Sequence, residues 1–227
     1  MKNIRNVWKM VCVGALMFPM SGMGQELVNV NGFESPDFMT GTLDGQSGWQ
    51  VLELGGSKDD VVVTEEVDLV YAGNQAVQLK SVGERVLARY KLDLTEAFWV
   101  DCMVRTPAKE EIKTNAAIFL RGRDAQGESK ILVALSFTSS GSITPFVDRD
   151  SARYPLGQWV RVTLHVRPAD GVWSVYLDQN LAAENLPFQV PGTASRFESL
   201  DFDWVGHSDI EGIGVGLDDL VISTEPL

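Results

Sequence analysis

The chain has 227 residues, with 31 acidic against 19 basic side chains and a formal net charge of −12. A surface of this charge repels phosphate backbones and anionic bilayers, so nucleic acid and membrane surfaces are disfavoured as partners. It also disfavours a strongly anionic polysaccharide, unless a local basic patch outweighs the net field.

The N-terminus has the three parts of a secretory signal peptide. Basic residues precede an apolar run over residues 11–20, which is too short to span a bilayer, and small residues follow as a cleavage site. We therefore expect a signal peptide over residues 1–24. The mature domain, residues 25–227, is expected to be secreted or periplasmic and to lack a transmembrane segment.

One cysteine, Cys102, remains in the expected mature domain, which therefore cannot form an internal disulfide. Cys102 lies between Val100 and Val104 in an alternating stretch, the pattern of a strand with one buried face. We interpret it as a small buried apolar side chain and not as a catalytic thiol.

Short strands separated by turn residues are expected along the first half of the domain. Asn-Gly, Gly-Gly and Ala-Gly-Asn sequences supply turns, and a Gly-rich loop covers residues 33–48. The expected strands cover residues 26–31, 49–54, 61–63, 75–81, 86–94 and 97–105.

The second half continues the same rhythm. Residues 115–122 and 130–139 should form a hairpin, and Pro145 marks the following strand as an edge or bulged strand. We expect a loop through Pro187 and Pro191. The remaining expected strands cover residues 142–147, 197–205 and 217–223.

The clearest pattern is a hairpin within residues 156–178. Apolar residues alternate with polar or amphipathic ones, and a Pro-Ala-Asp-Gly turn joins this strand to a second one. The inward set is Val160, Val162, Leu164, Val166, Trp173, Val175 and Leu177. With a dozen or so short strands and no convincing helix, the chain is predicted to be all-β: a single antiparallel jelly-roll sandwich of two sheets.

The hairpin also resembles a known fold family. Its pattern G-x-W-x-x-V-x-L, then W-x-V-Y-L-D, and the closing stretch over residues 214–222 are similar to concanavalin A-like lectin/glucanase sandwiches, including laminin-G-like domains. Gln179 departs from the family pattern, which has Gly or Asn after the Asp at position 178. The resemblance implies the fold, but that fold hosts lectins, glycosidases, lyases and adhesion modules.

One acidic stretch bears on catalysis. The residues around Asp201 and Asp203 are similar to the E-x-D-x-E strand of laminarinase-like glucanases, in which alternate acids share one face. Asp201 and Asp203 would share a face, whereas Glu198 would point to the opposite side in a regular strand. We interpret Asp201 and Asp203 as a polar face beside a buried one, and as weak catalytic candidates only.

A second resemblance concerns metal binding. Some carbohydrate-binding sandwiches hold a structural Ca²⁺ with an early acid and a late Asp, which implies Glu34 and Asp219 here, with Asp218 adjacent. Calcium takes six to eight oxygen ligands, so loop carbonyls would complete the site.

Sugar binding needs aromatic rings for stacking and nearby polar groups that fix hydroxyls. Such residues occupy strand positions opposite the apolar face, which the concave sheet of this fold would present to a ligand. They are Trp99, Asp101, Arg121, Arg161, His165 and Tyr176.

The sequence thus favours an exported, non-catalytic carbohydrate-binding module that binds a glycan or polysaccharide. Two alternatives stay open. The first is a glycoside hydrolase or polysaccharide lyase of the same fold, and the second is a structural or adhesion domain without a sugar site.

Overall fold

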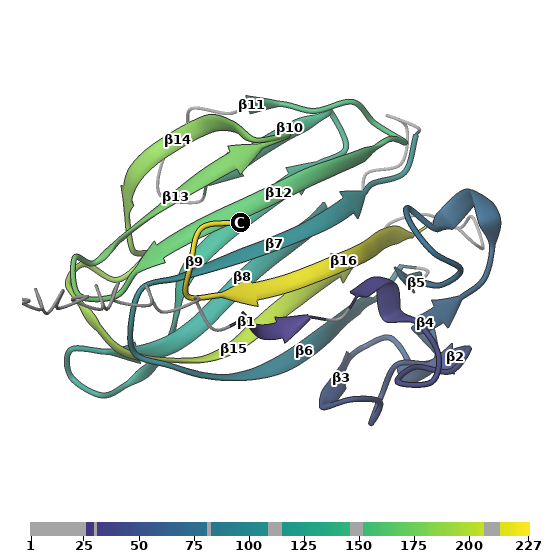
Figure 1. The fold of residues 1–227 in the computed structure, drawn as a ribbon, viewed down its shortest axis with the longest axis horizontal. Coiled ribbons are helices and arrows are strands. Elements are labelled where there is room, and N and C mark those ends of the chain that lie inside the picture. The colour runs from purple at the N-terminus through teal and green to yellow at the C-terminus, as the bar shows by residue number, and fades with distance from the viewer. Residues whose placement is uncertain (1–25, 30, 81–82, 109–114, 146–151, 207–213) are drawn as a thin grey trace, which may run out of the picture.

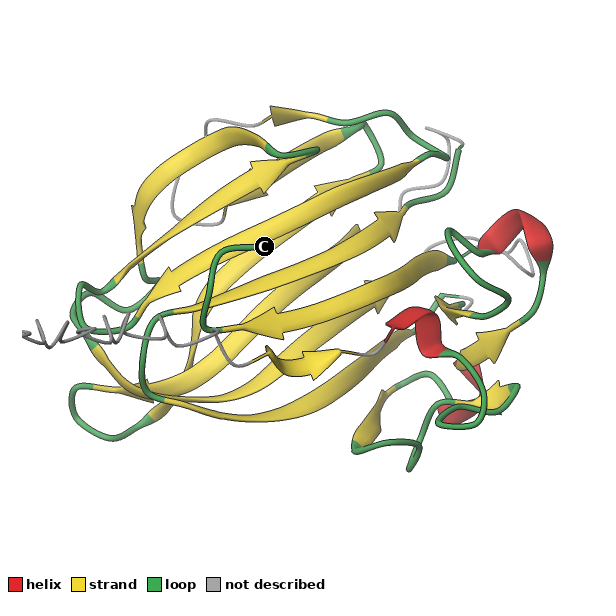
Figure 2. Ribbon diagram, in the orientation of Figure 1, coloured by secondary structure: helices red, strands yellow, loops and turns green. Residues whose placement is uncertain are grey.

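The computed structural model describes residues 26–29, 31–80, 83–108, 115–145, 152–206 and 214–227. The expected signal peptide lies outside these residues. Strands dominate the described chain, and its helical segments are three single turns (Figure 2). These turns are η1 (Asn31–Phe33), η2 (Lys58–Asp60) and η3 (Val67–Leu69). Within the described residues, no helix is long and apolar enough to cross a membrane.

The strands form two antiparallel sheets stacked face to face, with sheet A in front of sheet B in Figure 1. Sheet A has the order β14 (Asn180–Pro187), β13 (Val172–Leu177), β12 (Trp159–Arg167), β7 (Phe98–Arg105), β16 (Val215–Ser223), β5 (Ala76–Leu79), β4 (Val61–Thr64) and β2 (Gly41–Thr42), and β1 (Glu26–Asn29) pairs with β16. Sheet B has the order β11 (Ala152–Arg153), β10 (Ser142–Pro145), β9 (Ser129–Thr138), β8 (Asn115–Asp124), β15 (Ala194–Val205), β6 (Arg85–Leu94) and β3 (Trp49–Leu54). The predicted all-β sandwich of two sheets is confirmed.

The predicted central hairpin is β12 and β13, paired from Val162 opposite Leu177 to Arg167 opposite Val172. Its inward residues on β12 are buried in the core, and Trp173 is completely buried. Because side chains alternate across a strand, burying this set forces the intervening residues of β12 onto the outer surface of sheet A.

Cys102 is buried in β7, as predicted, and burial raises the pKa of its thiol well above the ordinary value. A protonated, inaccessible thiol is a poor nucleophile, so the structure agrees with a packing role.

Two predictions about the edges need correction. Residues 180–187 were expected to be a loop, but they form strand β14, which pairs with β13. The strand gave no signal because it is an edge strand in which nearly every residue is exposed, so no alternation of apolar residues is needed. The strand containing Pro145 was expected to be an edge or bulged strand, but β10 lies between β9 and β11; Pro145 is its last residue, opposite Leu135 and beyond the two residues that pair with β11.

Trp173→Ala should lower the free energy of unfolding by about 3–5 kcal/mol, because it removes a fully buried indole from the core. Chemical denaturation measures this loss, and Leu54→Ala, at an exposed position, is the control. A midpoint for Trp173→Ala that matches the control would contradict the assignment of Trp173 to the core.

Candidate functional site

Each sheet turns one face to the core and the other outward, and the two outer faces carry different chemistry. On sheet A lies an aromatic strip, defined as Tyr71, Trp99, Trp159, His165 and Tyr176. On sheet B lies an arginine network, defined as Arg85, Arg89, Arg121, Arg123, Glu198, Asp201 and Asp203.

One end of the aromatic strip is built across β7, β12 and β13. Trp99 lies directly opposite His165 in the ladder, and their rings stack with centroids 4.0 Å apart and planes 2° apart. Tyr176 adds a third ring 5.9 Å from Trp99. Burial, followed by nearby Arg167, lowers the pKa of His165, which favours the neutral form of the imidazole. The three half-buried rings form an aromatic cluster in which Trp99 and His165 are stacked face to face and Tyr176 is tilted by 38° relative to Trp99.

The middle of the strip is polar and firmly held. Asp101, which is largely buried, accepts hydrogen bonds from Arg161 Nε at 2.9 and 3.0 Å and from the hydroxyl of Thr163. Arg161 and Thr163 are successive outward residues of β12, between Trp159 and His165 on the same face. The ion pair therefore fixes a guanidinium group between the two aromatic ends.

The other end of the strip is Trp159, which packs edge-on against Tyr71 with centroids 5.9 Å apart. The indole lies across Gly216 of β16, where a methyl group would come within 2.7 Å of the ring. A glycine at this position therefore lets Trp159 lie close to the sheet.

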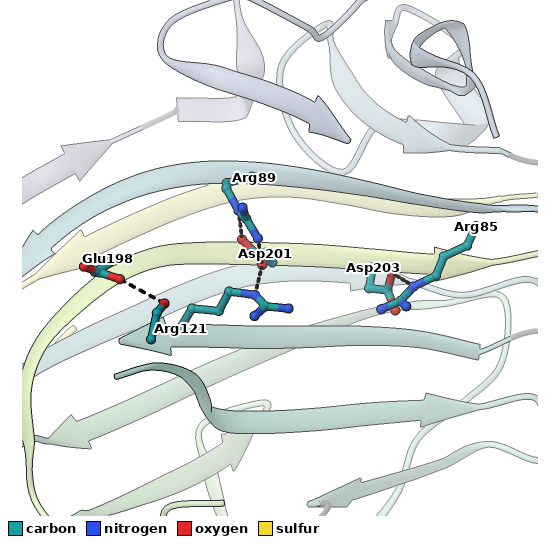
Figure 3. A network of polar contacts seen from close by, with 7 residues as sticks. Arg85, Arg89, Arg121, Glu198, Asp201 and Asp203 are labelled. Carbon is teal, nitrogen blue, oxygen red and sulfur yellow. Dashed lines mark hydrogen bonds and ion pairs between the residues drawn. The ribbon is translucent and has the colours of Figure 1, made fainter. Parts of the chain in front are cut away.

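The arginine network is centred on Asp201 of β15, whose side chain is 0% exposed although it points away from the core. Arg89 of β6 donates from Nε and Nη2 to its two oxygens, each at 2.7 Å, and Arg121 of β8 donates from Nε at 3.0 Å. Figure 3 shows the two arginines reaching Asp201 from opposite sides. Because β15 lies between β6 and β8, this arrangement follows from the strand order.

Two further ion pairs extend the network along β15. Asp203 accepts from Arg85 Nε at 2.7 Å, and Glu198 accepts from Arg123 Nε at 2.7 Å. Glu198 was expected to face away from Asp201, but a bulge between Phe197 and Ser199 interrupts the alternation and brings it to the same side.

The weak catalytic candidates, Asp201 and Asp203, therefore hold arginines. Burial raises the pKa of Asp203, with Arg85 opposing the shift, and Asp201 is enclosed by two guanidinium groups. Both carboxylates thus accept hydrogen bonds from arginine side chains.

The predicted sugar-binding residues divide between the two faces. Trp99, Asp101, Arg161, His165 and Tyr176 come together on sheet A. Arg121 lies on sheet B, whose outer face points the other way, so it cannot join them. Sequence reasoning missed Tyr71, which lies in a loop, and Arg85 and Arg89, whose alternation with buried Val86 and Ala88 was a usable signal.

Of the acids expected to bind calcium, Glu34 and Asp218 both contact the loop over residues 71–75. Glu34 Oε1 accepts from the backbone N–H groups of Asn74 and Gln75 at 2.6 and 2.9 Å. Although burial acts to raise it, these bonds hold the pKa of Glu34 below its ordinary value. It is Asp218, not Asp219, that accepts from the same loop, at Tyr71 N and Ala72 N.

The geometry at Gly32 brings the two acids together. A methyl group there would lie 3.4 Å from Glu34 Oε1 and 3.5 Å from Asp218 Oδ1. Burial raises the pKa of Asp218 to about 6, although three hydrogen bonds from backbone N–H groups act to lower it. Asp219 has a positive φ of 46°, and its electrostatic neighbours include Asp101 and Arg161 of the aromatic strip.

No protein-family model matches the sequence, and no curated protein matches it. Among solved structures, the cellulose-induced protein Cip1 is similar with a TM-score of 0.57 and 13% identity, over 83% of this chain and 98% of that one. A mutant of the Emp46p carbohydrate recognition domain gives a TM-score of 0.55 and 10% identity, over 80% of this chain and 90% of that one.

A sialidase is also similar, with a TM-score of 0.53 and 14% identity. The match covers 78% of this chain but only 17% of the sialidase chain. At these identities the likeness shows the fold alone: the chain is a concanavalin A-like β-sandwich.

Asp201→Asn should destabilise the protein by about 3–5 kcal/mol, because it leaves two partly buried guanidinium groups without their buried counter-charge. Glu198→Gln is the matched control, since its side chain is 27% exposed and its ion pair should contribute at most about 1 kcal/mol. Chemical denaturation compares the two. Equal losses would contradict a special role of Asp201 in fixing the arginines.

Proposed function

We propose that the protein is a non-catalytic carbohydrate-binding module that holds a glycan along the aromatic strip of sheet A. The observation that carries the proposal is the half-buried Trp99–His165–Tyr176 cluster beside the fixed Arg161–Asp101 pair. Ring faces stack on the apolar C–H faces of sugars, and a fixed guanidinium and hydroxyl orient their polar groups.

The length of the strip favours a chain over a single sugar. Trp159 and His165 lie on the same face of β12, and six residues of extended strand span about 20 Å. Several linked sugar rings would lie between the two aromatic ends, with Arg161 and Thr163 beneath the middle of the chain. We also propose that the protein is exported, as the signal-peptide pattern over residues 1–24 predicts, to bind a glycan outside the cell.

The enzymatic alternative receives less support because Asp201 and Asp203 are bonded to arginines. A purely structural role leaves unexplained why two tryptophans, a histidine and a tyrosine occupy outward positions when the core already contains Trp49, Trp173 and Trp204. Outward aromatic residues in a group are typical of a binding surface.

The experiment is affinity electrophoresis against a panel of polysaccharides, with each sample assayed for new reducing ends. We expect retardation without cleavage by at least one neutral polysaccharide. Trp99→Ala should weaken that binding about tenfold or more, since central aromatic side chains dominate binding energies. Leu54→Ala, at an exposed apolar position on β3 of sheet B, is the control and should bind normally.

New reducing ends would make the protein an enzyme. Equal retardation of Trp99→Ala and the wild type would place the glycan elsewhere. No retardation across the panel would support a structural or protein-binding domain.

We further propose a structural Ca²⁺ held by Glu34 and Asp218. Among the described residues, no group of three or more His, Cys, Asp or Glu side chains could hold a metal, so backbone and amide oxygens would have to contribute. Gln75 fits this need. Its backbone bonds to Glu34, and its side-chain Oε1 is buried without a hydrogen-bond partner.

Calcium should raise the melting temperature of the wild type, and Glu34→Gln should abolish the rise. Asp219→Asn is the control and should keep it, because Asp218 is the acid that contacts the 71–75 loop. The rise should weaken as the pH falls through about 6, where Asp218 takes up a proton that competes with the metal. A rise lost in Asp219→Asn and kept in Glu34→Gln would contradict this site.

A further inference from the structure

The arginine network on sheet B carries more positive than negative charge. Four guanidinium groups face three carboxylates, and Lys91, exposed on β6 opposite Ser199, adds another positive charge on the same face. The neighbouring pair of Arg196 and Asp93 adds no net charge. In a protein with a formal net charge of −12, this is the local basic patch that could attract an anionic ligand.

The arginines are held in fixed orientations but stay accessible. Arg85 and Arg121 bond to the carboxylates through Nε, which leaves the two terminal nitrogens of each outside these contacts. Their side chains are 41% and 33% exposed. A guanidinium fixed from behind loses little conformational entropy on binding, so the ion pairs prepare it for a second acceptor.

The buried Asp201 is the feature that a purely structural explanation does not cover. An outward position on a strand does not need a charge that is 0% exposed, and enclosing one carries a desolvation cost. That cost is explained if Asp201 fixes Arg89 and Arg121 in place for a ligand. The bidentate contact of Arg89 with Asp201 also displays the planar geometry in which arginine binds carboxylates.

We propose that the outer face of sheet B is a second binding site, distinct from the aromatic strip, that takes a chain of uronic acid sugars. Asp201 and Asp203 are two residues apart on β15, so the carboxylates that hold Arg121 and Arg85 lie about 7 Å apart along the strand. Guanidinium groups held at two successive positions of β15 suit carboxylates that recur along a sugar chain, and the planar carboxylate matches the fork of arginine.

The test is isothermal titration with hexagalacturonate, its methyl-esterified form and a sulfated neutral oligosaccharide of similar length. Hexagalacturonate should bind, and esterification, which replaces each carboxylate by an uncharged methyl ester, should abolish binding. Arg121→Gln should weaken the binding about tenfold or more, because a charge-assisted contact is lost. Arg167→Gln is the control, since it removes the same charge from a similarly exposed, ion-paired arginine on β12 of sheet A, on the opposite side of the molecule.

Arg85→Gln is the second variant in case Arg121→Gln is misfolded, because Arg85 of β6 contacts only Asp203 in this network and leaves Asp201 untouched. Trp99→Ala should bind hexagalacturonate normally, which separates this site from the aromatic strip. Three results would overturn the proposal: no binding, undiminished binding by both arginine variants, or loss of binding in Trp99→Ala. Stronger binding of the sulfated oligosaccharide would overturn the assignment of the ligand to uronic acids.

Discussion

The register between β7 and β12 is the constraint on which the molecule depends. Eight successive pairs, from Trp159 opposite Arg105 to Val166 opposite Phe98, lock the centre of sheet A. Because side chains alternate, this one register sends the valines and Leu164 into the core and places Trp99 against His165 outside. A slip by a single residue would expose the core and bury the Arg161–Asp101 pair, so stability and the proposed binding surface are coupled.

The two outer faces differ in the charge balance around their buried carboxylates. On sheet A, Asp101 is enclosed by Arg161 and Thr163 among uncharged rings, which suits a neutral ligand. On sheet B, Asp201 is outnumbered by its guanidinium partners, which suits an anionic one. In both cases a buried carboxylate fixes the side chains that a ligand would touch, at a desolvation cost that the ion pairs offset.

The sequence allowed the hairpin and most of the core to be predicted because alternation over β12 is a direct consequence of one-sided burial. It did not allow the site residues to be grouped, because alternation shows that Arg121 points outward but not from which sheet. Irregular backbone is not visible in the sequence. The bulge beside Glu198 brought that side chain to the side of Asp201, and the irregular register between Asp218 and Val221 placed Asp218 against the loop at Tyr71 and Ala72.

The central claim is that a glycan lies on the aromatic strip, and the most direct measurement is nuclear magnetic resonance of the tryptophan indole N–H groups. A bound oligosaccharide, taken from the polysaccharide that retards the protein most, should shift the signals of Trp99 and Trp159. The signal of Trp173, which is completely buried between the sheets, should stay unchanged. If neither outward tryptophan responds while the oligosaccharide demonstrably binds, the strip is not the binding surface and the account of sheet A is wrong.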